Sequence, residues 1–170
     1  MNRNFLHAAL HRAREGMESQ ISGSSMEPAI PRGATIRVFP EPACGYQVGM
    51  VVACLSAGED LFAHRLVRQA KSHGTSYILT LGDAWLICDP PTASGDIIGV
   101  VSAYKHEGDW RSPPASARRG WLSEQLARSS VVLVWLALKV HPGLARRVSG
   151  TLLRLTALLN APKRAMRVDG

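Results

Sequence analysis

The sequence lacks the features that define several common classes of protein. Its cysteines are few and odd in number, and none forms a Cys-x-x-Cys pair. This argues against a disulfide framework and a zinc site, and it favours a reducing compartment. Residues 1–16 contain scattered His and Arg where a secretory signal would have an apolar stretch. The longest uncharged, mostly apolar run of the C-terminal part, residues 129–138, is about half of the roughly 20 residues that a spanning helix needs. We therefore expect a cytoplasmic protein without a transmembrane helix.

Acidic residues are scarce in one part of the chain only. The 170 residues include 20 Lys and Arg against 13 Asp and Glu, for a net charge of +7. Residues 21–104 carry a net charge of −2, whereas residues 105–170 carry +8. A basic tail on a near-neutral domain is typical of an attachment device, so we expect peripheral membrane or partner contact through the tail and no nucleic-acid binding. The alternatives are a solvated helix face and a helical hairpin that covers its own domain.

The pattern of apolar residues predicts a mostly β (α+β) protein. Helical spacing predicts a short N-terminal helix within residues 1–20. Alternating or β-branched runs, separated by Gly- and Pro-containing turns, then predict a β domain over residues 21–104. Its expected strands are residues 34–39, 46–55, 61–67, 75–81 and 97–104.

The remaining residues predict a linker and a basic helical tail. Gly, Pro and Ser interrupt residues 105–120, and residues 121–140 then read as one helix within the tail of residues 121–170. Pro142 suits the first turn of a second helix, and Pro162 would end it. This second helix is amphipathic and basic, a type that lies on membranes or packs on a partner. Its apolar stripe consists of Leu144, Val148, Leu152, Leu155 and Leu159. If the tail serves attachment alone, deleting residues 116–170 leaves the function of the β domain intact.

Candidate catalytic residues lie in three segments of the β region. Ser25 lies in a serine-containing turn, His64 in an apolar strand, and Asp83 and Asp89 follow another strand. A serine hydroxyl needs a base to become a nucleophile, a neutral imidazole is the usual base, and a carboxylate can orient that imidazole. These residue types are common, and by themselves they fit a turn serine, a packed histidine and solvated acids better than they fit a catalytic set.

The local context of these residues is more specific. The matching segments are Gly23-Ser24-Ser25-Met26-Glu27-Pro28, Pro31-Arg32-Gly33, His64-Arg65-Leu66-Val67, Gly82-Asp83, Asp89 and Ile97-Ile98-Gly99-Val100-Val101. In these segments the chain resembles the type I signal peptidase family, in the histidine-base variant of the endoplasmic-reticulum and archaeal type. The resemblance covers residues 21–104, about half of the chain.

The resemblance implies a signal-peptidase or SOS-repressor type of β fold and a serine endopeptidase that cleaves leader- or signal-type peptides. It implies Ser25 as the nucleophile, His64 as the general base, and Asp89 or, as second choice, Asp83 as the orienting acid. It implies no metal and no cofactor. Two other functions stay open, which are a non-catalytic peptide-binding module of the same fold and a regulatory autopeptidase.

The chain departs from the family pattern at several positions. Ala34 and Met50 stand where the family usually has aspartates, and we interpret those acids as structural turn residues. Gly23 stands where some lysine-type members have a serine that assists the oxyanion hole. The transmembrane anchor of ordinary signal peptidases has no counterpart among the predicted elements.

Overall fold

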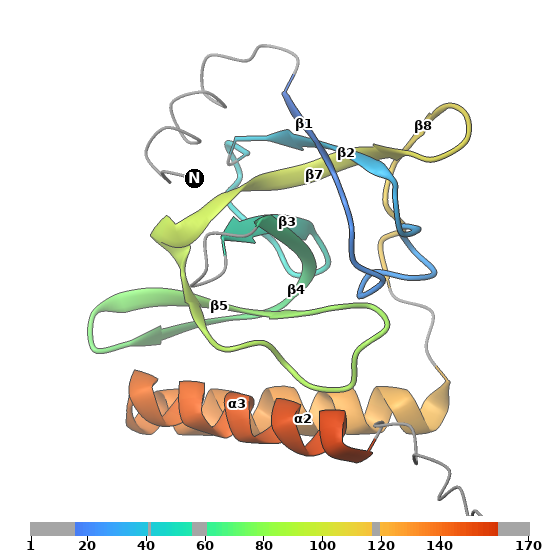
Figure 1. Ribbon diagram of the computed structural model, residues 1–170. Coiled ribbons are helices and arrows are strands. Elements are labelled where there is room, and N and C mark those ends of the chain that lie inside the picture. Colours follow the sequence, from blue (N-terminus) through green and yellow to red (C-terminus); the bar gives the residue numbers. More distant parts are fainter. Residues whose placement is uncertain (1–15, 41, 56–60, 117–119, 160–170) are drawn as a thin grey trace, which may run out of the picture.

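The computed structural model describes residues 16–40, 42–55, 61–116 and 120–159. Over these residues the chain forms a mixed α+β structure, in which a curled antiparallel half-barrel is followed by two C-terminal helices (Figure 1). The strands are β1 (Met17–Gln20), β2 (Thr35–Phe39), β3 (Val51–Leu55), β4 (Leu61–Ser72), β5 (Thr75–Leu81), β6 (Thr92–Ala93), β7 (Ile97–Lys105) and β8 (Trp110–Arg111). A 3-10 turn, η1 (Ser94–Asp96), precedes β7, and the helices are α2 (Trp121–Val140) and α3 (Pro142–Leu159).

The sheet brings early and late segments of the chain together. Its strand order is β1-β2-β7-β3-β4-β5-β6, and β8 pairs with β7. The late strand β7 therefore lies between β2 and β3, and every pairing is antiparallel. Register shifts interrupt the β2–β7, β3–β7 and β4–β5 ladders. Such bulges bend strands and increase their twist, which accounts for the curl of the sheet.

The main apolar core lies inside this curl and anchors the turn that contains Ser25. Met26 and Ile30 are fully buried there, next to the β2 side chain Ile36 and the β7 side chain Ile98. Burying a side chain of the size of Met contributes about 1.5–3 kcal/mol. Because Met26 is fixed in the core, the preceding residue Ser25 is held in place beside it.

A second apolar cluster joins the helices to the sheet. Leu79 of β5 and Cys88 pack against Val134 and Leu138 of α2 and Ala145 of α3, all buried. Figure 1 shows the two helices lying side by side below β4 and β5. The inner face of the hairpin thus covers its own domain, which is one of the alternatives left open by the sequence.

Several predicted segments differ from the structure. The strand expected over residues 61–67 continues to Ser72 as β4. The N-terminal helix is wrong for Met17–Gln20, which is strand β1. Met17 pairs with Val38 and packs against the core, so sheet pairing overrides helical spacing there; the rest of that helix lies outside the described residues. The strand expected from residue 46 begins only at Val51, because the chain turns at residues 48–49, where Gly49 has a φ of 99°. The linker contains the short strand β8.

The two helices predicted for the C-terminal tail are confirmed where the structure describes them. Helix α2 has the predicted bounds, and α3 begins at Pro142. The predicted stop at Pro162 lies outside the described residues. Within the part of the chain that the structure describes, neither helix combines the length and apolar character needed to cross a membrane.

Candidate active site

Ser25 lies in the turn between β1 and β2, and its backbone is fixed from two sides. On one side, Met26 and Ile30 are joined by a hydrogen bond from the Ile30 N–H to the Met26 carbonyl, at 3.0 Å. On the other side, the Ala84 N–H donates to the Ser25 carbonyl at 2.8 Å. The segment that follows β5 therefore closes directly onto the backbone of Ser25.

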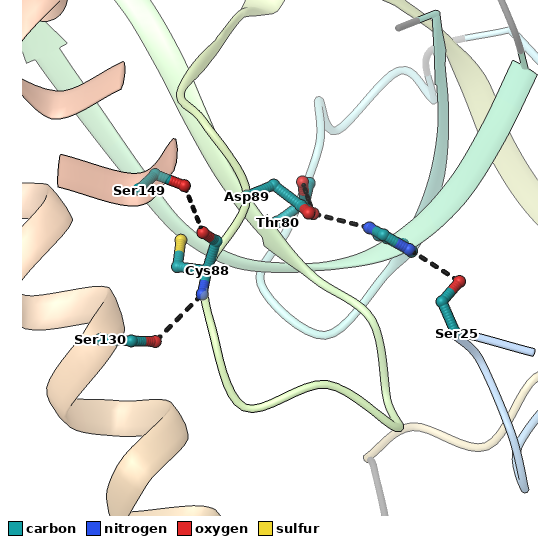
Figure 2. A network of polar contacts seen from close by, with 7 residues as sticks. Ser25, Thr80, Cys88, Asp89, Ser130 and Ser149 are labelled. Atoms are coloured by element: carbon teal, nitrogen blue, oxygen red, sulfur yellow. Dashed lines mark hydrogen bonds and ion pairs between the residues drawn. The ribbon is translucent and has the colours of Figure 1, made fainter. Parts of the chain in front are cut away.

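His64 lies in β4 and links this serine to an acid. Its Nε2 is 2.8 Å from Ser25 Oγ, and its Nδ1 is 2.6 Å from Asp89 Oδ2 (Figure 2). Its side chain is 5% exposed, and the rings of Phe62 and Trp85 make edge contacts with the imidazole, each at 5.1 Å between centroids. These contacts leave the imidazole little freedom to rotate.

Asp89 holds the histidine in one tautomer. Its carboxylate is buried and also accepts a hydrogen bond from Thr80 Oγ1, at 2.7 Å from Oδ2. The Asp89 N–H donates to the Thr80 carbonyl at 2.9 Å. Because an ionised carboxylate only accepts, the proton of a neutral His64 lies on Nδ1, and Nε2 is left to accept the Ser25 hydroxyl proton. Thr80 did not emerge from the sequence, where a threonine in an apolar strand carries no special signal.

Asp83, the second acid expected from the sequence, belongs to a different pair. Arg65 donates from Nε to Oδ1 at 2.9 Å and from Nη2 to Oδ2 at 2.6 Å, and both side chains are buried. Arg65 Nη1 also donates to the carbonyls of Gly49 and Pro114, at 2.7 and 2.9 Å. This bidentate pair joins β4 to the turn before β3 and to the segment before α2, which is a structural arrangement.

Gly82 permits the close approach of the segment after β5. A Cβ at this position would lie 2.7 Å from the Ser25 carbonyl oxygen and 3.1 Å from His64 Nε2. Both distances are too short for a side chain to fit without moving the serine or the imidazole. The glycine in the Gly82-Asp83 segment is therefore a steric requirement of the site.

Two buried thiols lie near the site, and both are held neutral. Burial, followed by the charges of Asp89 and Asp96, raises the pKa of Cys54 from 9.0 to about 12. Burial and then the charge of Asp89 raise the pKa of Cys88 well above its usual range. Since the thiolate is the reactive form, neither cysteine is suited to be a nucleophile at neutral pH.

No metal cluster accompanies the site within the described ranges, where no group of three or more His, Cys, Asp and Glu side chains is placed to hold an ion. A cavity of about 650 Å³ lies between β4 and α2, lined by Arg65, Leu66 and Val131 among others, and it does not include Ser25 or His64.

The comparisons with known proteins add no further constraint. No model of a protein family matches the chain, and no curated protein matches it. The structure brings together three of the four residues expected from the sequence, Ser25, His64 and Asp89, and pairs the fourth, Asp83, with Arg65.

Proposed function

We propose that the protein is a serine endopeptidase in which Ser25 is the nucleophile, His64 the general base and Asp89 the orienting acid. The observation that carries the proposal is the continuous row from the half-buried Ser25 Oγ through the buried His64 ring to Asp89 Oδ2, with contacts of 2.8 and 2.6 Å. A nucleophile within hydrogen-bond reach of a base that is itself oriented by a third group is the arrangement required for acyl transfer.

The chemistry follows from the positions of the protons. Ser25 Oγ attacks the peptide carbonyl while its proton passes to His64 Nε2, and Asp89 stabilises the resulting imidazolium. The backbone N–H of Ser25 supports the developing oxyanion. The imidazolium then donates its proton to the leaving amine as the C–N bond breaks, and an acyl ester remains on Ser25. His64 next takes a proton from water, the hydroxide attacks the ester, and Ser25 recovers its proton as the acid product leaves.

The proposed substrate is a leader- or signal-type peptide. This part of the proposal is supported by the resemblance of residues 21–104 to the histidine-type signal peptidases. The Ser25-Met26 and Gly82-Asp83 segments of that resemblance have structural reasons here, since Met26 anchors the serine turn in the core and Gly82 allows the close approach to it.

The nucleophile is tested with a fluorophosphonate probe and with a peptide that has small residues before the scissile bond. Wild-type protein is expected to be labelled on Ser25 and to cleave the peptide. Ser25→Ala is expected to lose labelling and at least about 1,000-fold in kcat. Ser24→Ala, the matched control one residue away, retains both.

Equal cleavage by wild type and Ser25→Ala would disprove the assignment. If wild type is not labelled by the probe and does not cleave the peptide, the non-catalytic binding module is favoured. Fragments of the chain that form on incubation of the protein alone, at a rate independent of its concentration, would favour the autopeptidase.

We also propose a peripheral membrane contact, and place it on α2. Seven large apolar side chains of this helix are exposed, within an arc of about 140° at 3.6 residues per turn. They are Trp121, Leu122, Leu126, Val132, Leu133, Leu136 and Val140. The basic residues Arg128, which pairs with Glu124 at 2.8 Å, and Lys139 lie at one edge of that arc. An apolar face with a basic edge is complementary to an anionic lipid surface.

The stripe expected on α3 fits this role less well. Its member Val148 packs against the cluster that joins the helices to the sheet, while Leu144 and Leu155 are exposed. In sedimentation with vesicles containing phosphatidylglycerol, Leu133→Ser/Leu136→Ser is therefore expected to lose binding and Leu155→Ser to retain it. Unchanged binding of the double variant would show that the membrane contact does not lie on α2. If wild type binds pure phosphatidylcholine vesicles as strongly as vesicles that contain phosphatidylglycerol, the role of the basic edge is contradicted.

A further inference from the structure

The α2–α3 hairpin holds the residue next to the orienting acid by both of its backbone polar groups. The Cys88 N–H donates to Ser130 Oγ of α2 at 3.0 Å, and Ser149 Oγ of α3 donates to the Cys88 carbonyl at 2.6 Å (Figure 2). The Ser130 hydroxyl donates its own proton to the Ala127 carbonyl at 2.8 Å. Its lone pair therefore remains available to accept from Cys88.

These two serines are polar groups in an apolar contact. Ser130 is 3% exposed and Ser149 is 0% exposed, and their neighbours in the cluster include Leu79, Val134 and Ala145. Residues 82–91 form no regular strand, so the Cys88 backbone groups have no sheet partner and would be buried without hydrogen bonds if the helices carried only apolar side chains. An unsatisfied buried backbone group is costly, and the two hydroxyls remove that cost.

The contacts at Cys88 also fix the position of the next residue, Asp89, which belongs to the row of Ser25, His64 and Asp89. Cys88 and Asp89 are consecutive, and their Cα atoms are separated by a fixed distance of about 3.8 Å. The Cys88 side chain points into the hairpin cluster, while the Asp89 carboxylate reaches His64 Nδ1 at 2.6 Å. Thr80 holds Asp89 from the side of the sheet, and the hairpin holds the same short segment from the other side. The place of the carboxylate is thus set by both.

We propose that Ser130 and Ser149 are positioning residues of the active site, through which docking of the helical hairpin orients Asp89 and so aligns His64 with Ser25. This inference rests on the proposed peptidase function. It implies that the domain of residues 21–104 reaches its catalytic geometry only with the hairpin seated on it. The hairpin would therefore support the geometry of the active site, in addition to any contact that its outer face makes.

The test compares Ser130→Ala and Ser149→Ala with wild type in the full-length protein. Each variant is expected to lower kcat by about tenfold to a hundredfold, since a displacement of about 1 Å at a catalytic group has effects of this size. KM is expected to stay within about twofold, because neither serine faces the nucleophile. Ser130→Thr, which keeps the hydroxyl, is expected to recover most of the rate. Ser129→Ala is the matched control, since the exposed Ser129 hydroxyl donates to the Gln125 carbonyl on the same helix.

A readout without substrate separates this inference from the peptidase proposal. The proton that His64 Nδ1 shares with Asp89 is expected to give a far-downfield resonance in the NMR spectrum of wild type. In Ser130→Ala and Ser149→Ala the resonance is expected to broaden or move upfield, as in Thr80→Val, while Ser129→Ala leaves it in place. Thermal unfolding of each variant verifies that it is folded at the temperature of the NMR measurement.

Three outcomes distinguish the two ideas. Loss of the downfield signal in both serine variants supports the positioning role, even where wild type cleaves no peptide and the peptidase proposal fails. An unchanged signal and an unchanged kcat in folded Ser130→Ala and Ser149→Ala overturn the positioning role and leave the peptidase proposal intact. A rate loss that Ser129→Ala shares also overturns it, because the effect would then be a general property of α2.

Discussion

His64 and Arg65 are neighbours in β4, and each holds a different aspartate. The side chain of His64 reaches Asp89, whereas that of Arg65 reaches Asp83. Consecutive residues of a strand project to opposite faces of the sheet, so the two acids are sorted to the two faces. Asp89 thereby lies in the row with Ser25, and Asp83 lies in a structural pair that ties β4 to the segments at Gly49 and Pro114.

The two aspartates are therefore expected to respond differently to the same substitution. Asp89→Asn removes the acceptor that fixes the His64 tautomer, and kcat is expected to fall by about 10,000-fold, the size of the corresponding effect in the Ser-His-Asp template. The fold is expected to survive, because the amide keeps the shape of the side chain. Peptide cleavage and the circular dichroism spectrum measure the two effects.

Asp83→Asn is expected to act on stability. It leaves the buried Arg65 guanidinium without its counter-charge, and breaking a buried pair in this way costs about 3–5 kcal/mol. Urea unfolding is expected to show a lower midpoint, while the folded fraction retains most of its kcat. A specific activity as low as that of Asp89→Asn, with unfolding unchanged, would reverse the roles assigned to the two acids.

Gly82→Ala tests the steric requirement at the site. The new Cβ would lie 2.7 Å from the Ser25 carbonyl oxygen and 3.1 Å from His64 Nε2, so the serine turn or the imidazole must move. We expect a fall in kcat of about a hundredfold. Gly95→Ala is the matched control, because a Cβ at that glycine meets no atom within 4 Å. Equal activities in the two variants would show that the approach at Gly82 is looser than described.

Thiol chemistry is expected to distinguish the three cysteines. Cys44 is exposed, and Cys54 and Cys88 are buried. In native protein at pH 8, iodoacetamide is expected to modify Cys44 and spare the other two, as measured by mass spectrometry of the intact chain. In urea all three are expected to react. Rapid native modification of Cys88 would contradict its packing under the hairpin.

The raised pKa of Cys54 also sets the sign of a pH effect on stability. Its folded pKa of about 12 lies above the ordinary value of 9.0. Between these values the folded state keeps a proton that the unfolded state releases, so the free energy of unfolding falls as pH rises through this window. Cys54→Ala is expected to make the decline between pH 9 and pH 11 shallower than in wild type, measured by urea unfolding. A slope identical to that of wild type would show that Cys54 does not contribute.

Removal of the helical hairpin is expected to unfold the domain or abolish activity. A chain ending at residue 116 would expose Leu79 and Cys88, which pack against α2 and α3, and would leave the Cys88 backbone groups unpaired. This is the reverse of the expectation from the charge pattern, under which the tail is dispensable for cleavage. Near-ultraviolet circular dichroism and peptide cleavage of the truncated chain decide between them, and full activity of a folded truncated chain would contradict the structural argument.

The local content of the chain could be predicted well from the sequence. Alternation and turn residues predict β2, β5 and β7 closely, and the bounds of α2 are those expected from apolar spacing and the Pro142 signal. The strand predicted over residues 46–50 is wrong, because the apolar character of this run does not reveal that the backbone turns at Gly49. The helix predicted for Met17–Gln20 is wrong as well, because the pairing of this segment with β2 is a long-range contact that outweighs local spacing.

The sequence by itself determined the mixed β and α content, the basic character of the tail and the candidate set of Ser25, His64, Asp83 and Asp89. Only the tertiary structure decided which acid faces His64, because that choice depends on the alternation of side chains in β4 and on how the segment after β5 folds back. Thr80, Ser130 and Ser149 also became visible only there. Their partners lie 9, 42 and 61 residues away along the chain, and a contact of this kind leaves no mark in local sequence when it is made by an ordinary hydroxyl.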